Sequence, residues 1–329
     1  MIMRRIWLAG LCIVFIMLWS SGWTASHFAV SSSSALSILT VRYIIVLLVL
    51  LVLISMLNQW RHISYRTIVA HLMIGALSHG LYLLGTIGAF ELGVSAAAVA
   101  FINSLQPVVT ACCAGSLTGE LTKPRQCKGL ILGLLSAVLI VSRSYQSGVS
   151  VVALALPLIA MLALAMGTIL NRRQAMKSNA AGEPSAPVLL LLTIHTTGAL
   201  VVIMPPALFG GHLTWQFSTS EWKAIVWLAL VVSLLAYAFM QLLVSQLTAL
   251  QLASLAYLAP PVTMLQGYFL FDNAMSTTDV IAMCIAAGAV YFMATTPGKI
   301  SSPRLSIVHS FSPGKATMTS SESCTNGKQ

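Results

Sequence analysis

Ten long apolar runs, bounded by charged residues, proline or serine clusters, dominate this sequence. A helix needs roughly 20 predominantly apolar residues to cross the hydrocarbon core of a bilayer, and it satisfies its backbone hydrogen bonds internally. We therefore expect an all-α membrane protein with ten transmembrane helices. The runs place these helices near residues 6–28, 35–57, 67–89, 94–116, 128–143, 149–170, 187–209, 222–244, 248–270 and 276–296.

The composition excludes a soluble protein. Hydrophobic residues make up 58% of the 329 positions and charged residues only 7%, against about 25% in a soluble domain. The net charge of +10 comes from short loops and termini without a groove-reading motif, so we expect no nucleic-acid partner. The 6 cysteines show neither a metal-ligand spacing nor a disulfide framework, and we expect no metal and no cofactor.

The distribution of the 17 lysines and arginines orients the predicted spans. With a cytoplasmic N-terminus, all of them lie on the cytoplasmic side except Arg143 and Lys223, which lie outside, and Arg42, which lies within the second span. Because basic loops are retained in the cytoplasm, both termini are expected there, with the protein in the cell inner membrane. The polar, serine-rich segment 299–329 is expected to be a disordered cytoplasmic tail.

The two halves of the chain resemble each other at a shift of about 153 residues. This shift brings Pro107 onto Pro260, and it brings one pair of small residues onto another pair suited to close helix packing. The two pairs are Gly129 with Gly133, and Ala282 with Ala286. A five-span unit repeated once must have opposite orientations in the membrane. We therefore expect two inverted five-helix repeats, at residues 1–146 and 147–298.

The stretch 89–141 resembles a known protein family most clearly. It has small residues at the start of a span, a central proline at Pro107, a closing Gly119-Glu120 pair and a glycine-spaced span after it. These features resemble the fourth and fifth spans of the EamA-type ten-span transporters in the drug/metabolite transporter superfamily. The segment "LWSSGWTASHFAV" at 18–30 is similar to the first span of that family.

Two further segments carry the resemblance. The run "ILTVRYIIVLLVL" at 38–50 is similar to the family's second span with its embedded arginine. The second half departs more: it keeps "YLAPPVTMLQGYFLFDNAM" at 257–275, but Asp272-Asn273 replaces the Gly-Glu pair. The resemblance implies an exporter of small metabolites or drug-like solutes, and not an enzyme.

Polar and aromatic side chains within the predicted spans are the candidates for solute binding. Such groups are costly in hydrocarbon, so they line a cavity or bind a neighbouring helix. The structural alternatives, a bond between helices or an aromatic ring at the membrane interface, stay open for each of them. The candidate residues are Trp19, Ser20, Trp23, Arg42, His79, Tyr82, Asn103, Gln106, Tyr237, Gln241, Tyr257 and Gln266.

Arg42 lies about seven residues into the second span, where a lipid-facing charge costs several kcal/mol. Its guanidinium could bind an anionic group of the solute or pair with an acid. Two structural alternatives are that the side chain snorkels to the outer interface or makes a bond between helices.

His79 shares a helix face with Tyr82 and His71. Histidine titrates near neutral pH, so His79 could carry a proton that is coupled to solute movement. A bond to a neighbouring hydroxyl or carbonyl is the structural alternative.

Two prolines and two acids complete the predicted features. Pro107 is expected to kink the fourth span and free a backbone carbonyl for a polar ligand, with Pro260 in the opposite wall. Glu91 is expected as a solvated acid in an outer loop, and Glu120 as a helix-capping acid in a cytoplasmic loop.

The predicted function is secondary transport of a small solute by alternating access, with export as the direction; the sequence leaves open whether a proton is coupled to it. A membrane channel or a non-transporting scaffold is the alternative. An intramembrane enzyme is disfavoured because the sequence has no paired carboxylates and no H-E-x-x-H motif. The sequence does not distinguish a monomer from a homodimer.

Overall fold

The computed structural model describes residues 2–29, 33–94, 99, 102–141, 151–182, 186–209, 213, 215–271 and 275–294. Within these ranges all regular elements are helices and no strand occurs. Seven helices in them are long and apolar enough to cross a membrane. They cover Ile6–Ser26, Ala35–Met56, Tyr65–Glu91, Ala153–Ala180, Val188–Phe209, Thr219–Gln246 and Thr277–Ala294. The predicted all-helical membrane protein is confirmed to this extent.

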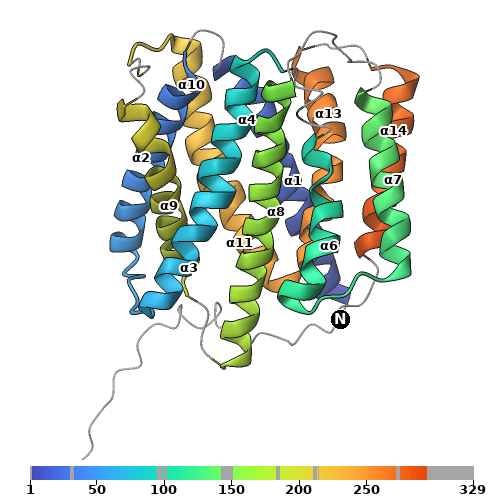
Figure 1. The fold of residues 1–329 in the computed structure, drawn as a ribbon, viewed down its shortest axis with the longest axis horizontal. Helices are drawn as coiled ribbons and strands as arrows, with labels where there is room; N and C mark the ends of the chain where they lie inside the picture. Colours follow the sequence, from blue (N-terminus) through green and yellow to red (C-terminus); the bar gives the residue numbers. More distant parts are fainter. Residues whose placement is uncertain are drawn as a thin grey trace, which may run out of the picture.

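The helices form one bundle (Figure 1). In chain order the elements are α1 (Ile2–Ala29), α2 (Ala35–Met56), α3 (Tyr65–Gly75), η1 (Ala76–Leu81), α4 (Tyr82–Glu91), α6 (Gln106–Thr118), α7 (Pro124–Val141), α8 (Val151–Ala180), α9 (Val188–Phe209), α10 (Thr219–Trp227), η2 (Leu228–Ala236), α11 (Tyr237–Gln246), α12 (Ala249–Ser254), η3 (Leu255–Leu258), α13 (Ala259–Phe271) and α14 (Thr277–Ala294). Here η1 and η2 are π-helical and η3 is a 3₁₀ turn.

Serine and threonine side chains determine where several helices begin. The Ser34 hydroxyl accepts a hydrogen bond from the Ser37 amide at the start of α2, and Ser64 caps α3 in the same way. Ser218 and Thr248 form capping boxes with the third residues of α10 and α12. These caps satisfy amides that have no partner within the helix.

The regular helical hydrogen bonding of the fourth and ninth predicted spans is interrupted just before their prolines. Leu105 forms a turn before α6, and Pro107 is the second residue of that helix. Pro260 is likewise the second residue of α13, which follows the 3₁₀ turn η3. Proline is tolerated in a first helical turn because its missing N–H has no acceptor there. The structure thus has an interruption before each of these prolines, and the predicted kink at Pro107 and Pro260 stays a prediction.

The sixth predicted span was expected to end near residue 170, but α8 continues to Ala180. The polar segment after Asn171 contains no glycine or proline until Gly182, so nothing in it ends the helix. Arg172, Arg173 and Lys177 therefore belong to a helix and not to a loop.

Small residues allow close helix contacts at two interfaces. A Cβ on Gly75 of α3 would lie 2.2 Å from the His195 carbonyl oxygen of α9, and one on Gly198 would lie 2.2 Å from the Leu72 carbonyl oxygen. At the far edge of the bundle α7 packs on α14 (Figure 1), where Gly129 lies against the Ala289 carbonyl.

Three other small residues of the predicted packing set lie near this edge. Gly133 faces the Tyr257 ring, and Ala282 and Ala286 are fully buried. The Ser136 hydroxyl also donates to the Ala282 carbonyl at 2.8 Å, which ties α7 to α14.

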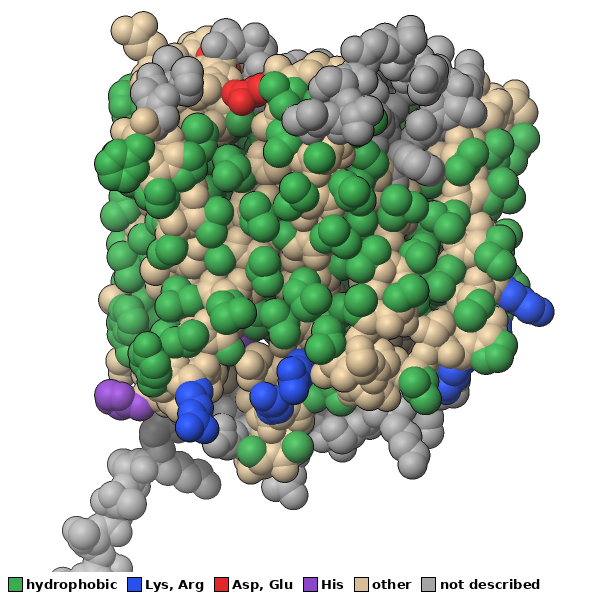
Figure 2. Space-filling model, viewed as in Figure 1, with side chains coloured by type: hydrophobic (Ala, Val, Ile, Leu, Met, Phe, Trp, Pro, Cys, Tyr) green, Lys and Arg blue, Asp and Glu red, His purple; other side chains and the backbone are tan. Residues whose placement is uncertain are grey.

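The outer surface fits a lipid environment. Figure 2 shows apolar side chains across the middle of one face, with lysine and arginine toward the end at which Figure 1 places the N-terminus. Exposed large apolar residues such as Leu48, Val52, Ile131 and Val201 lie on helices that are long enough to span a bilayer or that pack beside them. The chain is thus a multi-pass membrane protein.

Candidate functional site

A cavity of about 230 Å³ lies inside the bundle between the two halves of the chain. Helices of the first half contribute α1, α4 and α6 to its wall, and the second half contributes α8 and α11 to α13. We call this space the central cavity. It is lined by Phe15, Ile16, Trp19, Trp23, Tyr82, Asn103, Ser104, Gln106, Leu164, Thr168, Met240, Leu252, Ala256, Ala259, Pro260, Thr263 and Met264.

Asn103 is the most informative polar group in this wall. Its side chain is buried, and neither its amide nitrogen nor its amide oxygen has a hydrogen-bond partner in the described part of the chain. Gln106 is different, because its Nε2 donates to the Thr168 hydroxyl at 3.4 Å. A buried amide without partners costs about 1–3 kcal/mol per group. A polar ligand in the cavity would remove that cost.

Aromatic rings form another part of the wall of the central cavity. Trp19 stacks on Tyr82 with ring centroids 6.3 Å apart and meets the Tyr237 ring edge at 5.2 Å. Such rings offer broad apolar contact together with one polar edge. Trp19, Trp23 and Tyr82 also line a second, smaller cavity, so this group of rings lies between the two spaces.

The second cavity has a volume of about 30 Å³, and Arg42 of α2 lines it. Arg42 is only 1% exposed, and its Nε donates to the Ser233 hydroxyl of η2 at 2.7 Å. Its guanidinium also lies 5.7 Å from the centre of the Tyr43 ring. Arg42 thus lies inside the bundle, where snorkelling to the interface does not occur. The structure does not place it in the central cavity.

Three histidines meet in the bundle interior beside the aromatic rings, where His79 packs on Tyr237. The His71 Nδ1 lies 3.0 Å from the His195 Nε2, and the His195 Nδ1 lies 3.0 Å from the Gln241 Nε2. Gln241 accepts in turn from the Asn171 amide at 3.1 Å. The His79 ring centre is 5.3 Å from that of His195. We call His71, His79 and His195 the histidine cluster.

His79 occupies a tight position within the cluster. Its Nδ1 lies 2.9 Å from the Ser78 hydroxyl, and its ring centre is 3.8 Å from that of Tyr237. Its Nε2 is buried and has no partner among the described residues. The Tyr237 hydroxyl donates to the Ser78 carbonyl and the Tyr43 hydroxyl to the His79 carbonyl, at 3.1 and 3.4 Å. Both tyrosines therefore bind the π-helical segment η1.

Three of the predicted site residues lie elsewhere. Ser20 is fully buried, and its hydroxyl has no partner in the described part of the chain. The Tyr257 hydroxyl donates to the Leu130 carbonyl at 3.5 Å, against α7. Gln266 donates from Nε2 to the Met17 carbonyl at 2.9 Å and so ties α13 to α1. The structure thus brings Trp19, Trp23, Tyr82, Asn103 and Gln106 together around the central cavity.

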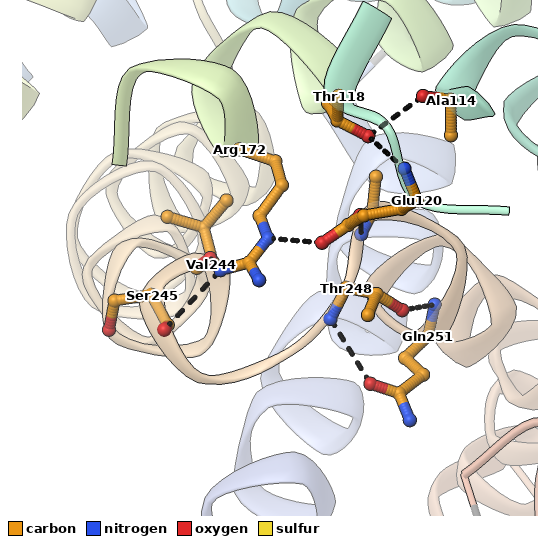
Figure 3. A network of polar contacts seen from close by, with 9 residues as sticks. Ala114, Thr118, Glu120, Arg172, Val244, Ser245, Thr248 and Gln251 are labelled. Carbon is orange, nitrogen blue, oxygen red and sulfur yellow. Dashed lines mark hydrogen bonds and ion pairs between the residues drawn. The ribbon is translucent and has the colours of Figure 1, made fainter. Parts of the chain in front are cut away.

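The two predicted loop acids both bind helix starts. Glu120 forms an ion pair with Arg172 at 2.8 Å, and its other oxygen accepts from the Ala249 amide at the start of α12 (Figure 3). Glu91 is the last residue of α4 and not a loop residue. It is exposed, and its carboxylate accepts from the Ala35 amide at the start of α2.

Sequence reasoning did not select several residues of this region. His195 was visible only as a single histidine within an apolar run, matched by the repeat shift to Arg42. Thr86 and Thr168 had no signal, because a threonine in a span usually bonds a carbonyl of its own helix. Thr168 does so with Leu164, but the Thr86 hydroxyl has no partner in the described part of the chain.

Comparison with known proteins gives a family match over residues 6–142 and a similar fold. Residues 6–142 match the sequence model of a family described as "EamA-like transporter family". No curated protein matches the chain. A solved structure described only as "Crystal structure of protein" is similar, with a TM-score of 0.70 and 18% sequence identity. That match covers 88% of this chain and 97% of the other, and at this identity it shows a shared fold alone.

Proposed function

We propose, from the match of residues 6–142 to the EamA-like transporter family, that this chain is a secondary transporter of small solutes. It moves them across the cell inner membrane by alternating access, and its direction is export. The observation that carries the proposal is the central cavity, whose wall is shared by the two halves and contains the unpartnered amide of Asn103. A solute held there contacts both halves at once.

The size and chemistry of the central cavity favour a small amphipathic metabolite. Its volume of about 230 Å³ is below the roughly 300–1,000 Å³ of pockets that hold drug-sized ligands. Its wall combines aromatic and aliphatic side chains with the amides of Asn103 and Gln106. No charged side chain lines it in the described ranges, so a solute without net charge suits it best. Drug-like molecules are the less favoured substrates.

Two features at equivalent positions support an inverted repeat of 1–146 and 147–298. The π-helical segments η1 and η2 interrupt the third and eighth predicted spans. The prolines Pro107 and Pro260 each stand at the second position of a helix that follows an interruption. Interrupted helices near the binding site are typical of secondary transporters with inverted repeats. Ten spans, with both termini in the cytoplasm, complete this arrangement.

Proton coupling is assigned to the histidine cluster rather than to His79 alone. The cluster lies beside the aromatic rings of the solute wall, because His79 packs on Tyr237 and Tyr237 packs on Trp19. No carboxylate bonds its rings in the described part of the chain, so histidine is the group there that can change charge near neutral pH. Solute release would then follow transfer of a proton within the cluster.

Purified protein in liposomes tests the proposal. Liposomes loaded with unlabelled amino acids or other small metabolites should take up the same labelled compound by saturable counterflow, and empty liposomes should not. Accumulation of the solute in everted membrane vesicles would show that the direction of transport is export. Flux without saturation or counterflow would favour a channel, and no flux with any solute would favour a scaffold.

A further inference from the structure

Arg42 is a buried cation that has no acidic partner among the described residues. It is 1% exposed, its hydrogen bond goes to the neutral Ser233 hydroxyl, and its ring contact is to the neutral Tyr43. No carboxylate forms an ion pair with it in the part of the chain that the structure describes. Arginine keeps its proton in proteins, so the charge cannot be removed by titration. Burying an unpaired charge costs far more free energy than burying a polar group, and an anion at this place would offset that cost.

The small cavity beside Arg42 is built for such an anion. Its volume of about 30 Å³ suffices for about two water molecules or one halide ion, and it is too small for a metabolite. The Thr86 side chain lines it, is 2% exposed, and its hydroxyl has no hydrogen-bond partner in the described ranges. A hydroxyl can donate one hydrogen bond to an anion. Ser26, from α1, lines the same cavity.

The titratable side chains around Arg42 provide no negative charge that could balance it. Tyr82 and Tyr237 line the small cavity, and His79 lies against the Tyr237 ring. None of these groups brings a negative charge at neutral pH. Two acids on helices that pack against α2 are used elsewhere: Glu91 of α4 binds the Ala35 amide, and Glu221 belongs to the capping box of α10.

We propose that Arg42 and Thr86 form a binding site for a small monovalent anion, separate from the central cavity. The anion accepts hydrogen bonds from the guanidinium and from the Thr86 hydroxyl, and it neutralises the buried charge. Two sources can supply this chemistry, a free halide ion such as chloride or a carboxylate group. The volume of about 30 Å³ and the ring pair Trp19–Tyr82 between the cavities favour the free halide.

Thermal unfolding of the detergent-purified protein tests the site in solutions of equal ionic strength. The salts are sodium chloride, sodium bromide, sodium acetate and sodium gluconate, whose anion is too large for the cavity. A ligand that binds the folded state raises the unfolding temperature. Chloride and bromide should raise it by about 3 °C or more over gluconate at saturating concentration. If acetate and not chloride raises the unfolding temperature, the site binds a carboxylate, and the assignment to a halide is overturned.

Two variants and one control separate the site from a general salt effect. Thr86→Val keeps the side-chain shape and should raise the apparent dissociation constant for chloride about tenfold, since one hydrogen bond to a charged partner is lost. Arg42→Met should unfold at the same temperature in all four salts. Thr193→Val is the matched control, because the Thr193 hydroxyl bonds the Leu189 carbonyl of its own helix and lies outside the cavity. It should respond to chloride as the wild type does.

The outcomes for the anion site and for transport are independent. Equal unfolding temperatures of the wild type in chloride, acetate and gluconate would overturn the site, even if liposomes show counterflow. A chloride effect that Thr86→Val retains in full would also overturn it. A chloride effect lost in both variants would support the site, even if no solute is transported.

Discussion

Arg172 and Glu120 join four helices at one end of the bundle. The Arg172 Nε lies 2.8 Å from the Glu120 Oε1, and the side chains are 8% and 15% exposed. Arg172, on α8, also donates from Nη1 to the Val244 carbonyl at 3.1 Å and the Ser245 carbonyl at 3.4 Å near the end of α11 (Figure 3). Glu120, after α6, binds the start of α12. Each ion thus also binds the backbone groups left free at a helix end.

We expect two replacements of Glu120 to destabilise the protein by different amounts. Glu120→Gln removes the charge that balances Arg172, and loss of one partner from a buried ion pair costs about 3 kcal/mol. Glu120→Ala should cost more, because it also removes the acceptor of the Ala249 amide. The free energy of unfolding in mixed detergent micelles measures both. Lys177→Ala, at an exposed position of α8, is the control and should change it by less than about 0.5 kcal/mol. Equal stability of Glu120→Ala and the control would contradict the assignment.

Gly75 and Gly198 should not tolerate alanine. The added Cβ would lie 2.2 Å from the His195 and Leu72 carbonyl oxygens, and backbone atoms cannot move aside as a flexible side chain can. Helices α3 and α9 would have to separate, at a cost of about 3 kcal/mol. Gly88→Ala is the matched control, since its Cβ would have only Leu156 Cδ1 nearby, at 3.7 Å. It should be neutral or stabilising by up to about 1 kcal/mol, because alanine favours helix. If denaturant titration gives Gly88→Ala the same loss in free energy of unfolding as Gly75→Ala and Gly198→Ala, this packing is refuted.

The helices could be predicted because a bilayer imposes a length and a composition on each span. The ends of the helices were harder to predict. Helix α8 runs past residue 170 because a polar helix can continue into water, where charged residues no longer mark its end. The interruptions before Pro107 and Pro260 lie where the sequence predicted kinks. A proline constrains the residues before it, but whether the chain bends or restarts depends on the helices packed around it.

The sequence predicted which residues need polar partners better than it predicted whether their side chains face the cavity. Asn103, Gln106 and Tyr82 do line the central cavity, whereas Gln266 turns to the Met17 carbonyl. Polar character indicates that a side chain needs a partner, but helix rotation and crossing decide whether that partner is a cavity or a neighbour. His195 shows the same limit, since its contact with His71 joins α9 to α3 across 124 positions of sequence.

Asn103→Ala should weaken solute binding without weakening the fold. The amide has no protein partner in the described part of the chain, so its removal breaks no hydrogen bond of the protein. Loss of its bonds to a solute should raise the KM of saturable uptake about tenfold. Thermal unfolding should be unchanged or slightly raised, since an unpartnered buried group is removed. Ser116→Ala, on the exposed face of α6, is the control for both measurements. An unchanged KM in Asn103→Ala would remove Asn103 from the solute site.

His195→Gln should uncouple transport from the pH gradient. His195 bridges His71 and Gln241 at 3.0 Å on either side, and glutamine can keep hydrogen bonds there without taking up a proton near neutral pH. We expect counterflow without a gradient to persist, while accumulation driven by an imposed pH gradient is lost. Solute-induced proton flux in liposomes measures the coupling. His62→Gln, at an exposed position before α3, should behave as the wild type. Gradient-driven accumulation that survives in His195→Gln would exclude this residue as the carrier.

Equivalent points of the two halves should lie on opposite sides of the membrane. Leu92, just after α4, lies at the end where Glu91 binds the start of α2. By the repeat shift its counterpart is Ser245, whose carbonyl binds Arg172 at the other end. In a cysteine-free background, an impermeant maleimide should label Leu92→Cys and Trp215→Cys in intact cells. It should label Asn58→Cys and Ala181→Cys only after permeabilisation, because an odd number of crossings separates these loops from the first two. Labelling of Leu92→Cys and Ala181→Cys from the same side would show that the halves are not inverted five-span units.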